Sequence, residues 1–125
     1  AASDVYKRQR DDLIILIFLA KCNANFTDIK TRAIREYITR VRPQSQALSE
    51  QYVNSYLKSL NPDEEDFYRS LNNLKAKTPE EAAALAVDAF KVSAADGAVL
   101  YNERLYLAEL LQTLREYGLE PDVGF

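Results

Sequence analysis

The longest apolar run in the chain is formed by the eight residues from Leu13 to Ala20. Such a run fits either a buried strand or a helix that is apolar all round, and it is too short to span a bilayer. No second strand-like segment is available to pair with it. Since Asp11 and Asp12 precede the run and favour the positive end of a helix dipole, the sequence predicts a central buried helix over about 11–24.

Hydrophobic positions then recur at helical spacing in five further segments. The predicted helices cover about residues 28–41, 50–60, 62–76, 79–95 and 101–117. Their expected N-caps are Thr27, Ser49, Asn61 and Thr78, and Gly118 followed by Leu119 ends the last helix. The sequence therefore predicts an all-α bundle of about six helices.

The hydrophobic stripes also predict which side chains face the core. On the second helix these are Ile29, Ala33, Ile34, Tyr37, Ile38 and Val41, and on the third Tyr52, Val53, Tyr56, Leu57 and Leu60. On the sixth they are Leu105, Ala108, Leu111 and Leu114, widened by Leu107 and Leu110. The opposite side of the second helix carries Lys30, Arg32, Arg35, Arg40 and Arg42. We expect this basic side to be a solvated face rather than a phosphate-binding surface, because Asp28 and Glu36 lie among the cations.

The first and last pairs of predicted helices share an apolar pattern at an offset of 73 residues. Asn23 then aligns with Asp96, Ile34 with Leu107, and Tyr37 with Leu110. The charges differ, since Lys30 aligns with Glu103. We therefore expect two helical hairpins related by approximate two-fold symmetry.

Composition supports one helical domain. A chain of 125 residues suffices for a single core, and 3 Gly and 4 Pro leave little room for extended loops. Residues 1–45 carry nine Lys and Arg against five Asp and Glu, a net charge of +4, so the remainder carries −7 of the total −3. An acidic chain has no overall attraction to nucleic acid or anionic lipid, and we expect neither nucleic-acid binding nor membrane insertion.

The chain contains no His and a single cysteine, Cys22. These counts exclude an internal disulfide, suit a reducing, cytoplasmic compartment, and argue against a zinc site or a His-dependent nucleophile. We expect Cys22, near the end of a buried helix, to be inert.

The ends of the chain carry expectations of their own. Met is absent, so we expect a fragment or a processed product. Residues 4–9, Asp-Val-Tyr-Lys-Arg-Gln, match the translation of a transposase adapter used in sequencing libraries. Residues 1–9 are therefore interpreted as a non-native tail, residues 10–120 as the domain and residues 121–125 as a C-terminal tail. A genuine basic N-terminal tail is the alternative.

The segment from Ala94 to Arg104, with its Asp96-Gly97 pair and Glu103, resembles the Asp-Gly…Glu corner of TerB-like (tellurite-resistance) domains. The ending Leu110-Leu111…Leu114…Tyr117-Gly118-Leu119 is similar to the last helix of that family. The resemblance covers about residues 13–120 and implies a compact bundle with a corner in each half. The first corner, around Asn23, resembles the motif only weakly and lacks both acids.

The resemblance also implies a link of the acidic corner to divalent cations, which makes Asp96 and Glu103 candidate metal ligands, for calcium for instance. Two carboxylates are few for calcium, which takes six to eight oxygen ligands, and the spacing is not that of an EF-hand. The structural alternative is favoured: Asp96 caps the last helix, Glu103 lies in its first turn, and Gly97 supplies the turn. Asn23, Asp96 and Gly97 then form the structural corners.

The remaining candidates have structural explanations. The acids of 63–66 and 80–81 stand in predicted first helical turns, where the dipole favours them. Of the eight tyrosines, Tyr37, Tyr52 and Tyr56 fall on core stripes, whereas Tyr68 and Tyr106 fall outside them. A hydrolase using paired carboxylates has no support beyond the acids themselves.

We therefore predict a non-enzymatic TerB-like module, without a cofactor, that acts through protein contacts in a bacterial stress-response or envelope-associated assembly. The alternative is a domain that binds or senses a divalent cation at Asp96 and Glu103. The protein partner and the oligomeric state are not specified by the sequence.

Overall fold

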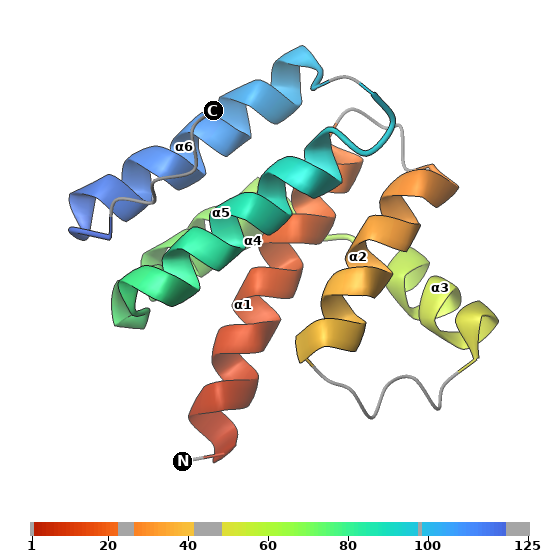
Figure 1. The fold of residues 1–125 in the computed structure, drawn as a ribbon, viewed down its shortest axis with the longest axis horizontal. Helices are drawn as coiled ribbons and strands as arrows, with labels where there is room; N and C mark the ends of the chain where they lie inside the picture. Colours follow the sequence, from red (N-terminus) through yellow and green to blue (C-terminus); the bar gives the residue numbers. More distant parts are fainter. Residues whose placement is uncertain (1, 23–26, 42–48, 98, 120–125) are drawn as a thin grey trace.

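The computed structural model describes residues 2–22, 27–41, 49–97 and 99–119, with the backbone alone for residues 2–10. The helices are α1 (Ala2–Lys21), α2 (Asp28–Val41), α3 (Glu50–Ser59), α4 (Glu64–Asn72), α5 (Pro79–Ser93) and α6 (Tyr101–Glu116), and the short 3₁₀ helix η2 (Asn73–Ala76) extends α4. Within these ranges there is no strand (Figure 1). The predicted all-α class is confirmed.

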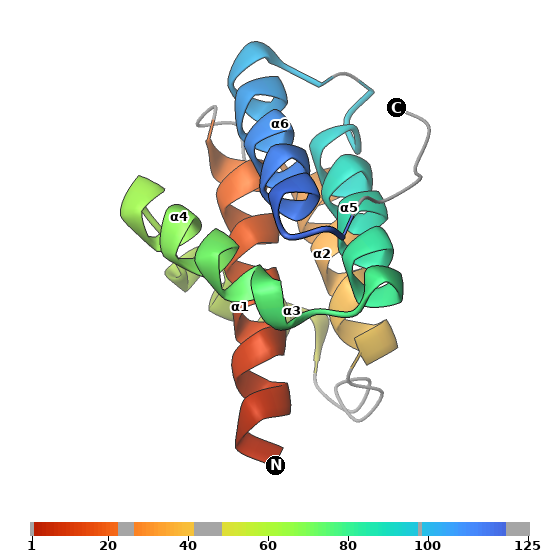
Figure 2. The ribbon, with the colours of Figure 1, turned by 90° about the vertical axis from the view of Figure 1, so that its left-hand side faces the viewer.

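Helix α1 is the centre of the bundle and packs against α2, α4, α5 and α6 (Figures 1 and 2). Its apolar run is buried continuously from Ile15 to Ala20, as predicted. The helix begins at Ala2 rather than near residue 11, because no Gly or Pro interrupts residues 2–12. Asp11 and Asp12 thus lie within the helix rather than in its first turn.

The two hairpins, α1–α2 and α5–α6, pack reciprocally: α1 contacts α6, and α2 contacts α5. Burial repeats at the predicted offset of 73 residues. Ile34 and Leu107 are both buried, as are Tyr37 and Leu110, and so are Lys30 and Glu103. This agreement supports the approximate two-fold relation of the hairpins.

Several predicted core positions are instead exposed. Ile29 on α2 and Leu105 on α6 are about half exposed, and Ala108 is exposed too. The buried lines run through Lys30, Ile34 and Tyr37 on α2 and through residues 103, 107, 110 and 114 on α6. The prediction holds for Ile34, Tyr37, Leu107, Leu110 and Leu114, and it fails where Lys30 and Glu103 are buried in place of Ile29 and Leu105.

Helix α3 is peripheral and packs mainly against α2. One narrow line of side chains, Val53 and Leu57, is enough to cover that contact. Tyr52 and Tyr56, predicted to face the core, are therefore exposed. The C-terminal end of α3 is tied to α1 by Lys21, whose Nζ donates to the carbonyl oxygens of Leu57 at 3.1 Å and Leu60 at 2.6 Å.

Local capping signals set most helix ends. Ser49 and Thr78 accept bonds from the amides of Tyr52 and Glu81, and Thr27 Oγ1 accepts from Lys30 N at 3.3 Å. The N-cap of α4 is Asp63 rather than the predicted Asn61.

The end of α6 is also as predicted. Gly118 has a φ of +72°, and the amide of Leu119 donates to Leu114 O at 2.8 Å. This bond and the positive φ are those of a Schellman C-cap.

Candidate functional site

The Asp96-Gly97 corner lies between the end of α5 and the start of α6. Gly97 has a φ of +99°, a conformation that favours glycine, as predicted. The N-cap of α6 is Leu100, without a side-chain cap bond, so the predicted capping role of Asp96 is wrong. Four residues separate Asp96 from the first residue of α6, Tyr101, and its carboxylate is directed elsewhere.

The partner of this corner is Lys30, in the first turn of α2. Its Nζ donates to Glu103 Oε1 at 3.0 Å and lies 3.9 Å from Asp96 Oδ2. The side chains of Lys30 and Glu103 have no solvent exposure, whereas that of Asp96 is 19% exposed. A cation that the sequence placed on a solvated face is therefore buried between the two hairpins.

Lys30 and Glu103 occupy equivalent positions in the 73-residue repeat. Residues close to a two-fold axis contact their own equivalents, so a like pair here would place two equal charges together. The opposite charges instead form an ion pair that joins α2 to α6. The charge mismatch of the repeat thus has a structural reason.

Burial makes this pair sensitive to the loss of one partner. Two ions lose their hydration in the interior, and their attraction repays that cost only while both are present. Removing either one leaves an uncompensated buried charge, which typically costs 3–5 kcal/mol. We therefore expect the pair to specify how the hairpins dock more than it adds to overall stability.

The same geometry argues against a divalent cation at Asp96 and Glu103. The two carboxylates do converge on one point, but the Lys30 ammonium lies at that point. A divalent ion there would face a buried positive charge and find two carboxylates where calcium takes six to eight oxygen ligands. These residues do not fit such an ion, and Asn23, the corresponding corner residue, lies outside the described residues.

Cys22 lies near this cluster, at the end of α1. Burial and the charge of Glu103 raise the pKa of its thiol to about 11. The reactive thiolate is therefore scarce at neutral pH, which agrees with the expectation of an inert cysteine.

A second partly buried ion pair joins α1 to the segment before α5. Lys77 Nζ donates to Asp12 Oδ2 at 3.0 Å, and their side chains are 4% and 13% exposed. Burial outweighs the attraction of Lys77 and raises the pKa of Asp12 to about 6. No sequence pattern indicates this pair, because its members are 65 residues apart and outside any repeat.

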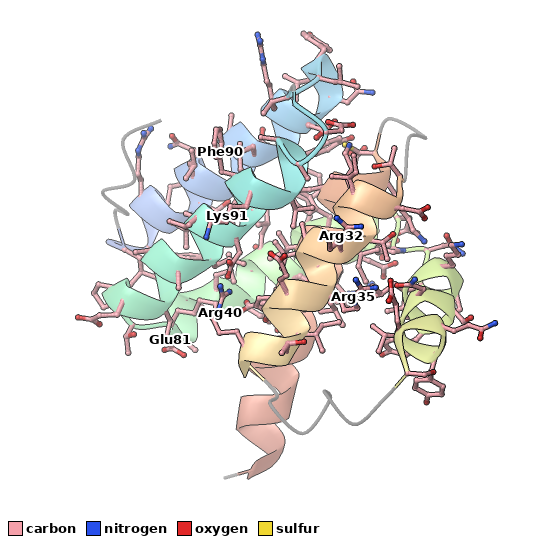
Figure 3. All side chains as sticks on the ribbon, turned by 45° about the vertical axis from the view of Figure 1, so that its right-hand side comes forward. Arg32, Arg35, Arg40, Glu81, Phe90 and Lys91 are labelled. Carbon is pink, nitrogen blue, oxygen red and sulfur yellow. The ribbon has the colours of Figure 1, made fainter. Side chains whose placement is uncertain are left out.

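The basic side of α2 is largely engaged with acids of neighbouring helices (Figure 3). Arg35 pairs with Glu50 of α3 at 2.8 Å, and Arg40 pairs with Asp88 of α5. Arg32 is exposed, and Arg42 lies outside the described residues. The predicted solvated face is therefore wrong for Lys30, which is buried, whereas Arg35 and Arg40 have structural partners.

The acids at the N-terminal ends of α4 and α5 lie where the sequence predicts, at the positive ends of the helix dipoles. Asp63 and Asp66 form a capping box on α4, and Thr78 and Glu81 form another on α5. Their charges also complement the helix dipoles.

Aromatic side chains gather between α1, α4 and α6. The rings of Phe18 and Phe67 stack with centroids 4.6 Å apart, and Tyr106 meets both edge-on. Tyr106 also donates from its hydroxyl to Glu64 Oε2 at 2.9 Å. Predicted to be off the core stripe, Tyr106 is half-buried against the core, and Tyr68 beside it is exposed.

The part of the chain that the structure describes contains no group of three or more His, Cys, Asp or Glu side chains arranged for a metal ion. Among the same residues, no helix has both the length and the apolar character needed to cross a membrane.

Comparison of the chain with protein-family models, with curated proteins and with solved structures found no match. The resemblance to TerB-like domains therefore rests on the residues of the α5–α6 corner and of α6.

Proposed function

We propose that this protein is a non-enzymatic helical module that acts by contacting other proteins, in the manner expected of a TerB-like domain. The proposed setting is a bacterial stress-response or envelope-associated assembly. One observation carries the proposal: large apolar and aromatic side chains are exposed in groups on the outer faces of two helices.

On α3 the group consists of Tyr52 and Tyr56, one turn apart and 61% and 49% exposed. On α6 it consists of Tyr101 and Leu105, also one turn apart and 74% and 48% exposed. Exposed tyrosines supply much contact area at a low entropic cost, and they are enriched at protein interfaces. Single exposed apolar residues need no explanation, but repeated i, i+4 pairs favour a binding role.

The acids of the corner support the same proposal indirectly. Glu103 and Asp96 neutralise Lys30 inside the fold, so their charge serves the docking of the hairpins. Because these acids act inside the fold, the proposed contacts with other proteins are made by the outer surfaces of the helices.

The proposal is tested by site-specific photo-crosslinking in a bacterial host. A photoreactive amino acid replaces Tyr52 or Tyr101 in separate variants, and Glu80, an exposed polar residue of α5, in a control. We expect discrete adducts of defined mass at one or both tyrosine positions and none at position 80. Adducts that are equally frequent at all three positions, or absent from all of them, would contradict the proposal.

A further inference from the structure

Where α4 and α6 lie side by side, their accessible side chains combine tyrosine rings with carboxylates. Glu64 and Tyr68 lie one turn apart on α4, and Leu105, Tyr106 and Glu109 lie on α6; we call these five residues the tyrosine–carboxylate face. The hydroxyl of Tyr106 donates to Glu64 Oε2 at 2.9 Å and so joins the two helices. Figure 2 shows α4 and α6 together against α1.

This face is accessible. Glu64, Tyr68, Leu105 and Glu109 are exposed, and Tyr106 is half-buried over Phe18 and Phe67. The Tyr106 ring packs edge-on against Phe18 and Phe67, with ring centroids 4.7 Å and 5.3 Å apart, and these contacts hold it in place. A partner would thus meet a preorganised surface, which lowers the entropic cost of binding.

The charges around the face are segregated. At 100° per residue, Glu109 and Glu116 lie on the flank of α6 that carries Tyr106, whereas Arg104 and Arg115 lie on the other flank. On α4, Arg69 is turned away from Glu64 and pairs with Glu65 at 3.1 Å and Asp66 at 3.2 Å. The carboxylates of the tyrosine–carboxylate face thus have no cationic partner among the ion pairs of the described residues.

The negative charge of the face helps to raise the pKa values of both of its tyrosines, Tyr68 and Tyr106. Burial and the charges of Glu109 and Glu64 raise the pKa of Tyr68, and the hydrogen bond to Glu64 raises the pKa of Tyr106. A guanidinium or ammonium group is attracted by carboxylates and also by the faces of tyrosine rings.

We propose that the tyrosine–carboxylate face binds a basic amphipathic helix of a partner protein, with an Arg or Lys placed over Tyr68 between Glu64 and Glu109. Apolar side chains of the same helix contact Leu105. The charge complementarity selects this occupant over an acidic segment or an anionic membrane. The inference rests on the proposed function and gives its partner a chemical class.

The test uses the full chain and two synthetic peptides of about 18 residues, long enough to form a helix. One peptide carries Leu on one face and Arg beside it, and in the other every Arg is replaced by Glu. Fluorescence anisotropy gives the affinity, and amide chemical shifts locate the bound peptide. We expect the Arg peptide to bind with shift changes on α4 and α6, with weaker binding at higher salt, and we expect no binding of the Glu peptide.

Two matched double variants assign the contact. Tyr68→Ala with Glu109→Gln removes an exposed tyrosine and an exposed acid from the face. The control, Ile29→Ala with Glu36→Gln, removes an exposed apolar side chain and an exposed acid from α2. Circular dichroism and melting temperature check that both fold. We expect the first variant to weaken binding of the Arg peptide about tenfold, as for the loss of one good charged contact, and the second to leave it unchanged.

Three results would overturn the inference: no saturable binding of the Arg peptide, equal binding of the Glu peptide, or equal effects of the two variants. Self-association that the Tyr68→Ala/Glu109→Gln variant abolishes, without peptide binding, would assign the face to a second copy instead. If the peptides fail while photo-crosslinking at Tyr52 or Tyr101 succeeds, the proposed function stands and this partner class is wrong.

Discussion

At the scale of single residues, the buried Lys30–Glu103 pair is the least expected feature of the molecule. We predict that Lys30→Met or Glu103→Leu alone lowers the free energy of unfolding by about 3–5 kcal/mol, since each leaves one buried charge unpaired. The double variant Lys30→Met/Glu103→Leu replaces both charges by apolar groups, and we expect it to lie within about 1–2 kcal/mol of the unaltered protein.

Urea denaturation of the four proteins measures this double-mutant cycle. A control cycle uses the exposed Arg69 and Glu65, whose ion pair is expected to contribute less than about 1 kcal/mol. Additive effects of the Lys30 and Glu103 substitutions would show that the two side chains do not interact in the folded protein.

Asp12 provides a second prediction at this scale, in the form of a pH dependence. Burial raises its pKa in the folded state to about 6 from an ordinary value of 3.8. Between about pH 4 and pH 6 the folded state therefore binds more protons than the unfolded state, so the contribution of Asp12 to stability falls as pH rises. A shift of about two pKa units corresponds to about 3 kcal/mol.

The measurement is the free energy of unfolding of the protein and of Asp12→Asn at intervals from pH 3.5 to pH 7. We expect their difference to change across this window, with the unaltered protein losing stability relative to the variant as pH rises. Parallel curves would show that Asp12 titrates with its ordinary pKa.

At the scale of helices and caps, the capping box of α5 is a local signal with a local effect. Thr78 Oγ1 accepts from Glu81 N at 3.2 Å, and Glu81 Oε1 accepts from Thr78 N at 3.0 Å. We predict that Thr78→Ala lowers the free energy of unfolding by about 1 kcal/mol. Ser55→Ala, an exposed position within α3, is the control and should change it by less than about 0.5 kcal/mol. Equal effects of the two substitutions in urea denaturation would contradict the role of Thr78.

The helices themselves could be predicted from the sequence because their signals are local. Prolines, N-cap side chains and apolar spacing act within one or two turns, and the observed range of α2, for instance, is the predicted one. The predicted start of α1 near residue 11 is wrong, because two acids favour a first helical turn but do not end the helix that precedes them.

Which side of each helix is buried depends on the neighbouring helices, so the sequence predicts the buried side less well than it predicts the bounds of the helix. Ile29 and Tyr52 lie on apolar stripes, yet they are exposed because the adjoining helices cover only part of each stripe. The pairing of Lys30 with Glu103 had one signal that could have revealed it. Opposite charges at equivalent positions of a repeat are what a two-fold axis through that point would require.

At the scale of the whole molecule, two hairpins pack reciprocally, and α1 of the first hairpin is the centre of the bundle. This arrangement leaves aromatic side chains exposed on α3 and α6. The docking places α4 beside α6 and so creates the tyrosine–carboxylate face from residues about 40 positions apart. No local sequence pattern predicts this face, because its residues become neighbours only when α4 and α6 both pack against α1.

The acids of the α5–α6 corner neutralise Lys30 within the fold, and we therefore expect them to bind no metal ion. Isothermal titration calorimetry with calcium, magnesium and zinc measures this, together with melting temperatures in each ion and in a chelator. We predict no saturable heat and no shift in melting temperature for the unaltered protein. Saturable heat and a melting shift that both disappear in Asp96→Ala would contradict the account and establish a cation site at Asp96 and Glu103.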